Sequence, residues 1–307
     1  FACKKTKINS TRTSVVISGE IPLESISTTA VSMIIGSNKT LKVLEDLPEL
    51  TYLKLKNTSV HSIADCQSLS ILTVEDNKKL ERIEHLDNLF ELTGTQCTKL
   101  RNINLNNLNE VALKDCTQLR TLVAPTIEIM SLIRCTKIKF PKIGSMLKTI
   151  KLHSCHSIKT LEFLQIPNLH LDHLEVNNCS NISEISGIKN CKSIVVQDCS
   201  SIQKIHSLSK IGSITIDKCP ELMYINHLTK TKYCSISRCD NINVLYRVQV
   251  LTSMLVEYCP KLDAIDHIIS PELIVRYCSR LARLYVNKKT TQLFLEECSM
   301  LDYIKFD

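Results

Sequence analysis

The sequence has few of the residues on which compact cores and ligand-binding loops usually depend. Its 307 residues include no Trp, only 6 Gly and 5% aromatic residues. A large aromatic core is therefore not expected, and no Gly-rich phosphate-binding loop is present. No apolar run approaches the roughly 18 residues that a membrane-spanning helix needs. The first residue is Phe rather than Met. We therefore expect a processed product or an excised piece, from which any signal peptide has been removed.

The charge and the polar motifs do not indicate an enzyme. Thirty-eight basic and 31 acidic residues give a formal charge of +7, which by itself implies no nucleic-acid partner. No convincing Ser/His/Asp set is present, and no Cys and His residues have the spacing of a zinc site. In the segment 153–156, Cys155 is expected to face inward and His153 outward. No catalytic residue, metal site, cofactor or small-molecule substrate is therefore predicted.

A repeat of about twenty residues fills the chain instead. It reads apolar-x-apolar-x-x-Cys-x-x-apolar-x-x-apolar, as in Leu174–Ile185, Ile194–Ile205 and Ile214–Ile225. The centre position is occupied in turn by Asn38, Thr58, Asn77, Cys97, Cys116, Cys135, Cys155, Cys179, Cys199, Cys219, Cys239, Cys259, Cys278 and Cys298. Successive centres lie 19 or 20 residues apart, except for one gap of 24. That gap marks a four-residue insertion around Phe163–His173.

The repeat predicts a solenoid of stacked coils. Apolar-x-apolar is typical of a short strand with two side chains inward and the middle one outward. The later apolar pair fits an extended or 3-10 return path, and twenty residues leave little room for an α-helix. One coil buries too little to fold alone, so neighbouring coils must stabilise it. We expect residues 1–31 to form a lead-in and a degenerate capping coil. Residues 32–307 are expected to form about fourteen coils with an uncapped C-terminal end.

Fifteen cysteines invite a disulfide interpretation that the spacing opposes. Eleven occupy the centre position, whereas Cys66, Cys191 and Cys234 replace core aliphatic residues. Stacked coils hold equivalent side chains parallel and about 4.8 Å apart. A disulfide needs converging Cβ atoms roughly 3.5–4.5 Å apart. Free, buried thiols are therefore predicted, and the pairing of Cys3 is left open.

With Asn or Cys at its centre, the repeat resembles the leucine-rich repeat family over residues 15–306. The Cys-x-x-Leu coils resemble the cysteine-containing subclass, and the coils of Asn38 and Asn77 the commoner type. The resemblance implies a curved solenoid with a parallel β-sheet on the concave face, extended or 3-10 segments on the convex face and little α-helix. It also implies binding of proteins or other macromolecules, without catalysis.

A candidate partner-binding surface lies in the last three coils. Most outward strand positions are polar, but there they become apolar and aromatic, with arginines at the border. Such a stripe on an exposed sheet is typical of a binding hot spot. The residues are Tyr233, Arg238, Leu255, Tyr258, Ile274, Arg276, Tyr277 and Phe294. Alternatively, a missing C-terminal segment or a second copy covers these strands, because the chain stops at Asp307 without a polar cap.

Two further surface features are candidates. The stretch 134–159 holds seven Lys or Arg residues and no acid. Of its members, Arg134, Lys151 and His153 are expected to face outward, where they would meet an acidic protein, a sulfated or phosphorylated polymer or a membrane surface. A solvated face is the alternative. Candidate N-glycosylation sites with the Asn-x-Ser/Thr pattern are Asn9, Asn178 and Asn181.

These observations predict a non-enzymatic recognition solenoid, secreted or on the cell surface, that binds a protein through its concave face. One alternative is a structural component that self-assembles into a coat or an extracellular polymer. Another is a cytoplasmic adaptor, such as the substrate-binding arm of a ubiquitin ligase, which the cysteine-type repeat resembles.

Overall fold

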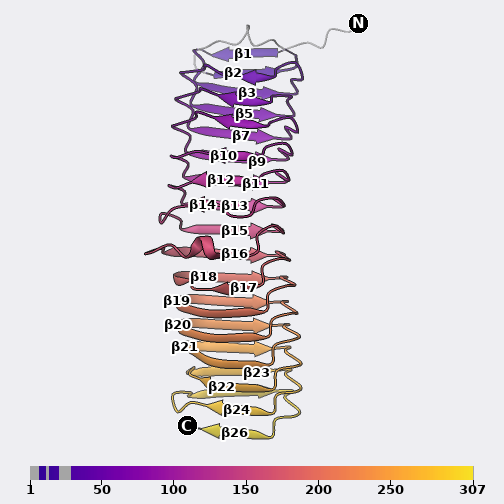
Figure 1. The fold of residues 1–307 in the computed structure, drawn as a ribbon, viewed down its shortest axis with the longest axis vertical. Coiled ribbons are helices and arrows are strands. Elements are labelled where there is room, and N and C mark those ends of the chain that lie inside the picture. Colours follow the sequence, from indigo (N-terminus) through magenta and orange to yellow (C-terminus); the bar gives the residue numbers. More distant parts are fainter. Residues whose placement is uncertain (1–6, 12–13, 21–28, 307) are drawn as a thin grey trace. The chain divides into compact units, whose positions relative to one another are not determined.

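The computed structural model describes residues 7–11, 14–20 and 29–306. It forms two compact units, Phe1–Leu147 and Lys148–Asp307, and each is considered by itself. In both units the chain winds through short coils, and strands of successive coils pair with one another in β-sheets (Figure 1). No helix among the described residues is long and apolar enough to cross a membrane.

In the first unit, the strands that carry the apolar-x-apolar pattern form one parallel ladder. The strands of this unit are β1 (Lys7–Thr11), β2 (Ser14–Ser18), β3 (Ser32–Gly36), β4 (Val43–Leu44), β5 (Tyr52–Lys56), β6 (Ser62–Ala64), β7 (Ile71–Glu75), β8 (Arg82–Glu84), β9 (Glu91–Thr95), β10 (Asn102–Asn104), β11 (Glu110–Lys114), β12 (Thr121–Ala124), β13 (Ile129–Ile133) and β14 (Lys142–Ile143). The ladder runs β2-β3-β5-β7-β9-β11-β13. The return segments pair as β4-β6-β8 and β10-β12-β14.

The second unit has the same organisation with longer strands. They are β15 (Thr149–His153), β16 (Leu171–Asn177), β17 (Glu184–Ser186), β18 (Lys189–Gln197), β19 (Lys204–Asp217), β20 (Tyr224–Ser237), β21 (Val244–Glu257), β22 (Ala264–Ile268), β23 (Glu272–Arg276), β24 (Arg283–Val286), β25 (Gln292–Glu296) and β26 (Tyr303–Phe306). We call β15-β16-β18-β19-β20-β21-β23-β25 the front ladder. The back ladder comprises β17, β22, β24, β26 and the first residues of β19, β20 and β21.

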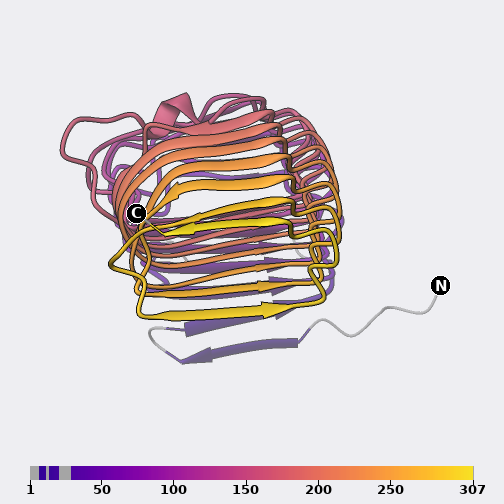
Figure 2. The ribbon, with the colours of Figure 1, turned by 90° about the horizontal axis from the view of Figure 1, so that it is seen from below.

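Front and back strands lie on opposite sides of a coil, as the yellow coil in Figure 2 shows. The return path is therefore extended, which is one of the two conformations that the apolar spacing allowed. The 3-10 conformation occurs in one helix of the described residues, η2 (Glu162–Leu164), within the four-residue insertion. Residues 7–11, expected only as a polar lead-in, form β1. This strand pairs antiparallel with β2 and covers its edge.

Stacking in register makes the core, as the repeat predicts. Met33, Leu53, Leu72 and Leu92 are partners on consecutive strands, and each is almost fully buried. Within β5, Leu53 and Leu55 face inward while Lys54 and Lys56 face outward. Every coil thus covers the apolar side chains of its neighbours, which a single coil cannot do.

The centre residues satisfy backbone groups where the strand turns. Asn38 is buried, its Nδ2 donates to the Gly19 carbonyl at 2.9 Å, and its Oδ1 accepts from the Leu41 N–H at 2.7 Å. A cysteine makes weaker contacts of the same kind, since the Cys179 thiol donates to the Leu152 carbonyl at 3.4 Å. All fourteen described cysteines are free thiols, and all but Cys298 are buried. Cys3 lies outside the described residues.

The residue before each centre has a left-handed backbone conformation. In order these residues are Ser37, Asn57, Asp76, Gln96, Asp115, Arg134, Ser154, Asn178, Asp198, Lys218, Arg238, Tyr258, Tyr277 and Glu297, with φ between 50° and 59°. We call them the turn column. Asn and Asp tolerate this conformation best, whereas large side chains adopt it seldom. The first nine members are small or polar apart from Arg134, and the last five are all long side chains.

Candidate partner-binding surface

The three apolar residues of the predicted stripe lie in one row of the front ladder. Leu255, Ile274 and Phe294 are partners on β21, β23 and β25 and lie side by side on the outer face of the front ladder. Phe294 is 50% exposed, and the other two are half-buried. The preceding residues in the same row are Thr215 and Ser235, so the row turns apolar at Leu255.

Two tyrosines of the turn column border this stripe. The rings of Tyr258 and Tyr277 stack in parallel, with centroids 4.6 Å apart and an interplanar angle of 6°. Their side chains remain exposed, at 48% and 37%. A bulky residue in the left-handed region strains the backbone. The fold itself does not need tyrosine there, because other coils make the same turn with Asn, Asp or Ser.

Arg238, the preceding member of the column, is turned toward the coil before it. Its Nε and Nη2 donate to Asp217 at 2.7 and 2.9 Å, and the Ser237 hydroxyl donates to the same carboxylate at 2.7 Å. Burial of Asp217 opposes its ionisation, but these hydrogen bonds outweigh burial and hold the pKa of its carboxyl below the ordinary value. The charge of Arg238 is therefore compensated within the protein.

An open groove of about 450 Å³ lies beside the tyrosine pair. It is lined by Arg238, Asp240, Tyr258, Pro260 and Tyr277. These rings and aliphatic carbons form a surface that a flat side chain of a partner can cover.

The remaining members of the predicted surface have different positions. The guanidinium of Arg276 lies 3.2 Å from Glu296, and the Tyr277 hydroxyl donates to the same carboxylate at 3.0 Å. That hydrogen bond raises the pKa of Tyr277. Tyr233 is exposed on β20, but its neighbour on β21 is Ser253, two residues before Leu255. It therefore lies apart from the groove.

Acidic side chains lie beside some of the bases of the stretch 134–159. Arg134, in the first unit, donates from Nη2 to Asp115 at 2.7 Å. In the second unit, His153 Nε2 lies 2.8 Å from Glu175, and Lys151 lies beside Glu175 in the ladder. The stretch itself holds no acid, but two of its bases have acidic neighbours from other coils in the structure. Stacking places acids from sequence positions about 20 residues away beside these bases, and Arg134 and His153 each lie within 4.0 Å of a carboxylate.

The candidate glycosylation sites differ in setting. Asn178 and Asn181 are exposed, and their Nδ2 atoms donate to Ser154 Oγ at 3.1 Å and to the His156 carbonyl at 2.5 Å. Asn9 lies in β1, opposite Val16. Among the described residues, no three His, Cys, Asp or Glu side chains are placed to hold a metal ion.

Tyrosines of the back ladder were not identified in the sequence. Tyr285 lies 5.7 Å from Tyr303, ring centroid to ring centroid. Tyr246 contacts His267 edge-on at 5.3 Å, and the guanidinium of Arg247 lies 5.0 Å from its ring centroid. Buried and outward residues alternate along the return strands, in which Leu245 and Leu284 are buried. This alternation predicts that the tyrosines next to them point outward.

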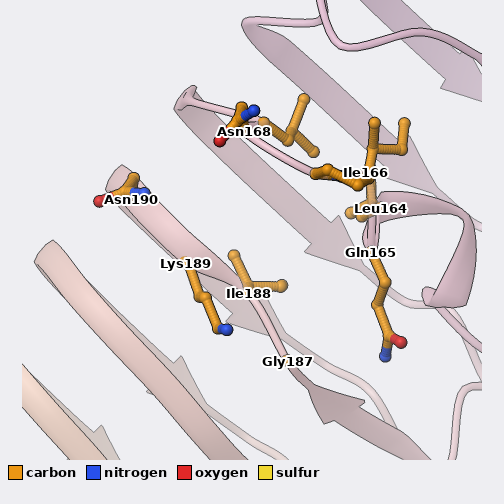
Figure 3. Close-up of a pocket in the computed structure, with 10 residues that line it drawn as sticks. Leu164, Gln165, Ile166, Asn168, Gly187, Ile188, Lys189 and Asn190 are labelled. Carbon is orange, nitrogen blue, oxygen red and sulfur yellow. The ribbon is translucent and has the colours of Figure 1, made fainter.

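The four-residue insertion forms a second groove, of about 500 Å³ (Figure 3). Leu164–Leu169 lie on one side and Gly187–Asn190 on the other, and Lys189 is its one charged lining residue. The Gln165 side chain packs on Gly187, where a Cβ would lie 3.1 Å from its Nε2. Gly187 also has φ +73°, so both the space and the backbone favour glycine.

Comparison with known proteins rests on structure alone. No family model matches the sequence, and no curated protein matches it significantly. The structure is similar to a leucine-rich cell surface protein of Faecalibacterium prausnitzii, with 13% identity, a TM-score of 0.34 and coverage of 100% of this chain and 94% of that one. It is also similar to a leucine-rich repeat protein of Eubacterium ventriosum, with 12% identity, a TM-score of 0.34 and coverage of 98% of this chain and 93% of that one. A leucine-rich repeat protein of Bacteroides ovatus is similar with 14% identity, a TM-score of 0.37 and coverage of 94% of this chain and 95% of that one.

Identities and TM-scores this low say nothing of function. The fold is instead established by the coils themselves, through the register of their strands and the burial of the repeated apolar positions. Each unit is a parallel β-solenoid, and the two units together hold about fourteen coils with almost no helix, as the sequence predicts.

Proposed function

We propose that this chain is a non-enzymatic recognition solenoid that binds a partner protein at the C-terminal end of its front ladder. The observation that carries the proposal is the row of Leu255, Ile274 and Phe294 on adjacent strands, bordered by the stacked Tyr258 and Tyr277. Apolar and aromatic side chains that stay exposed on a polar sheet are the usual core of a protein interface.

The shape of this surface favours a protein over a small molecule. The row is an outer sheet face and the groove beside it is open, whereas small-molecule sites enclose most of their ligand. Tyr and Arg are the residues that most often dominate the binding energy of protein interfaces. We further propose a secreted or surface-exposed location, which the exposed acceptors Asn178 and Asn181 support.

A pull-down with matched variants tests the proposal. Wild type, the double variant Ile274→Ser with Phe294→Ser, and the control Leu251→Ser serve as baits for an extract of the source cells and their medium. Leu251 is 47% exposed in the same unit, so its substitution matches the change in apolar surface. We expect a protein captured by wild type and control and lost from the double variant, with equal melting temperatures.

Capture of the same proteins by all three baits would contradict the proposal. Light scattering of the same three proteins identifies the case in which the partner is a second copy of this chain. In that case the double variant is monomeric, whereas wild type and control associate.

A further inference from the structure

We propose that the Tyr258–Tyr277 pair binds a positively charged side chain, so that the partner's contacting segment is rich in Arg or Lys. This inference rests on the proposed function and names the chemistry of the partner. It starts from the order of the turn column, in which Arg238, Tyr258, Tyr277 and Glu297 occupy equivalent positions on consecutive coils.

The geometry leaves one face of the pair accessible. Tyr277 stacks on one face of Tyr258. On the other side comes the coil of Arg238, whose guanidinium is held by Asp217 of the coil before. The groove lies beside Tyr258 on this side, with Arg238 and Asp240 in its wall. A planar guanidinium from a partner can lie there against the Tyr258 ring.

The charges around the pair favour a cation. Arg238 and Arg276 are compensated by Asp217 and Glu296. Of the residues that line the groove, Arg238 and Asp240 are charged, and Asp240 has no ion pair within 4.0 Å among the described residues. The one unpaired charge among the lining residues is therefore negative, although the whole chain carries +7.

The chemistry of the pair points the same way. A cation over a Tyr face is attracted by the electron density of the ring. The hydrogen bond from the Tyr277 hydroxyl to Glu296 holds that ring in place at the edge of the pair. Arginine combines a planar group that stacks on the ring with donors that can pair with Asp240 at the rim.

Binding of capped hexapeptides tests the inference. Hexa-arginine, hexaglutamate and hexaproline are titrated into the protein, and binding is followed by calorimetry and by the NMR signals of the tyrosine rings. We expect hexa-arginine to bind and to shift the ring signals of Tyr258 and Tyr277, and the other two peptides not to shift them. Because the chain is basic overall, attraction of hexa-arginine requires a local acidic site.

Variants locate the binding. Tyr258→Leu with Tyr277→Leu removes both rings and should weaken hexa-arginine binding about tenfold or more. Tyr258→Phe with Tyr277→Phe keeps the rings and should stay within about threefold. The matched control is Tyr224→Leu with Tyr303→Leu, exposed on the back ladder, which should bind like wild type. Asp240→Asn with Glu297→Gln should weaken binding several-fold and reduce its salt dependence.

Three results would overturn the inference. They are hexa-arginine binding equally to the leucine variant, hexaproline shifting the ring signals instead, and no binding of hexa-arginine at millimolar concentration. The phenylalanine variant separates loss of the rings from loss of the fold. The double variant Ile274→Ser with Phe294→Ser should bind hexa-arginine normally. Absence of hexa-arginine binding would therefore not contradict the pull-down result, and a negative pull-down would not contradict hexa-arginine binding.

Discussion

Arg238 reaches back one coil to Asp217 and donates two hydrogen bonds to it, at 2.7 and 2.9 Å. The two residues lie 21 positions apart in the sequence, yet they are neighbours in the stack. Asp217 is buried and Arg238 exposed, so the pair joins the edge of the core to the candidate surface.

Asp217→Asn should lower the free energy of unfolding at pH 7 by about 1–3 kcal/mol, because it removes the charged acceptor of Arg238 and Ser237. The folded-state pKa of Asp217 lies below its unfolded value. Its contribution is therefore present above the unfolded pKa and is lost as the pH falls through the folded pKa.

Urea unfolding at several pH values between about 7 and 2.5 measures this effect. The difference in stability between wild type and Asp217→Asn should shrink at the acidic end. The control Asp302→Asn, an exposed carboxylate, should differ little from wild type at any pH. A constant difference across the range would show that Asp217 does not titrate as described.

Cys179→Ser should destabilise the protein by about 1–3 kcal/mol without affecting the candidate surface, because it places a more polar group in an apolar column. Thermal unfolding and capture of the partner measure the two quantities. The Cys298→Ser change, in a half-buried position, should cost less. Loss of partner capture by folded Cys179→Ser would show that the thiol has a further role.

Alkylation by iodoacetamide at pH 8 should distinguish the thiols. Burial raises the pKa of Cys191 to about 11 and that of Cys199 to about 12, so almost no thiolate is present and the reagent is excluded as well. Peptide mass spectrometry should find Cys298 modified before these two. Equal rates for all three in folded protein would contradict the buried assignment.

Gly187→Ala should cost about 1 kcal/mol or more, since φ is +73° and the added Cβ would crowd Gln165. Gly36→Ala is the matched control in a strand, because its Cβ would meet only the Ile17 carbonyl at 3.9 Å. Chemical unfolding should show the first variant destabilised and the second not. Adding Gln165→Ala to Gly187→Ala should recover the part of the loss that comes from crowding.

Local spacing was sufficient to predict the coils and the direction of most side chains. Leu255, Ile274 and Phe294 could be assigned to one row because strands alternate strictly and the coils recur every 19 or 20 residues. The same rule also predicted the buried centre residues. It was not applied to the return strands, so the exposed Tyr224 and Tyr303 of the back ladder were not found.

The sequence by itself determined the repeat, the solenoid and the inward or outward direction of each strand residue, because these follow from a period in the chain. Only the tertiary structure decided which outward residues pair. It placed Asp115 beside Arg134, Glu175 beside His153 and Asp217 beside Arg238, and it stacked Tyr258 on Tyr277. These contacts depend on side-chain rotamers, which the spacing of apolar residues does not encode.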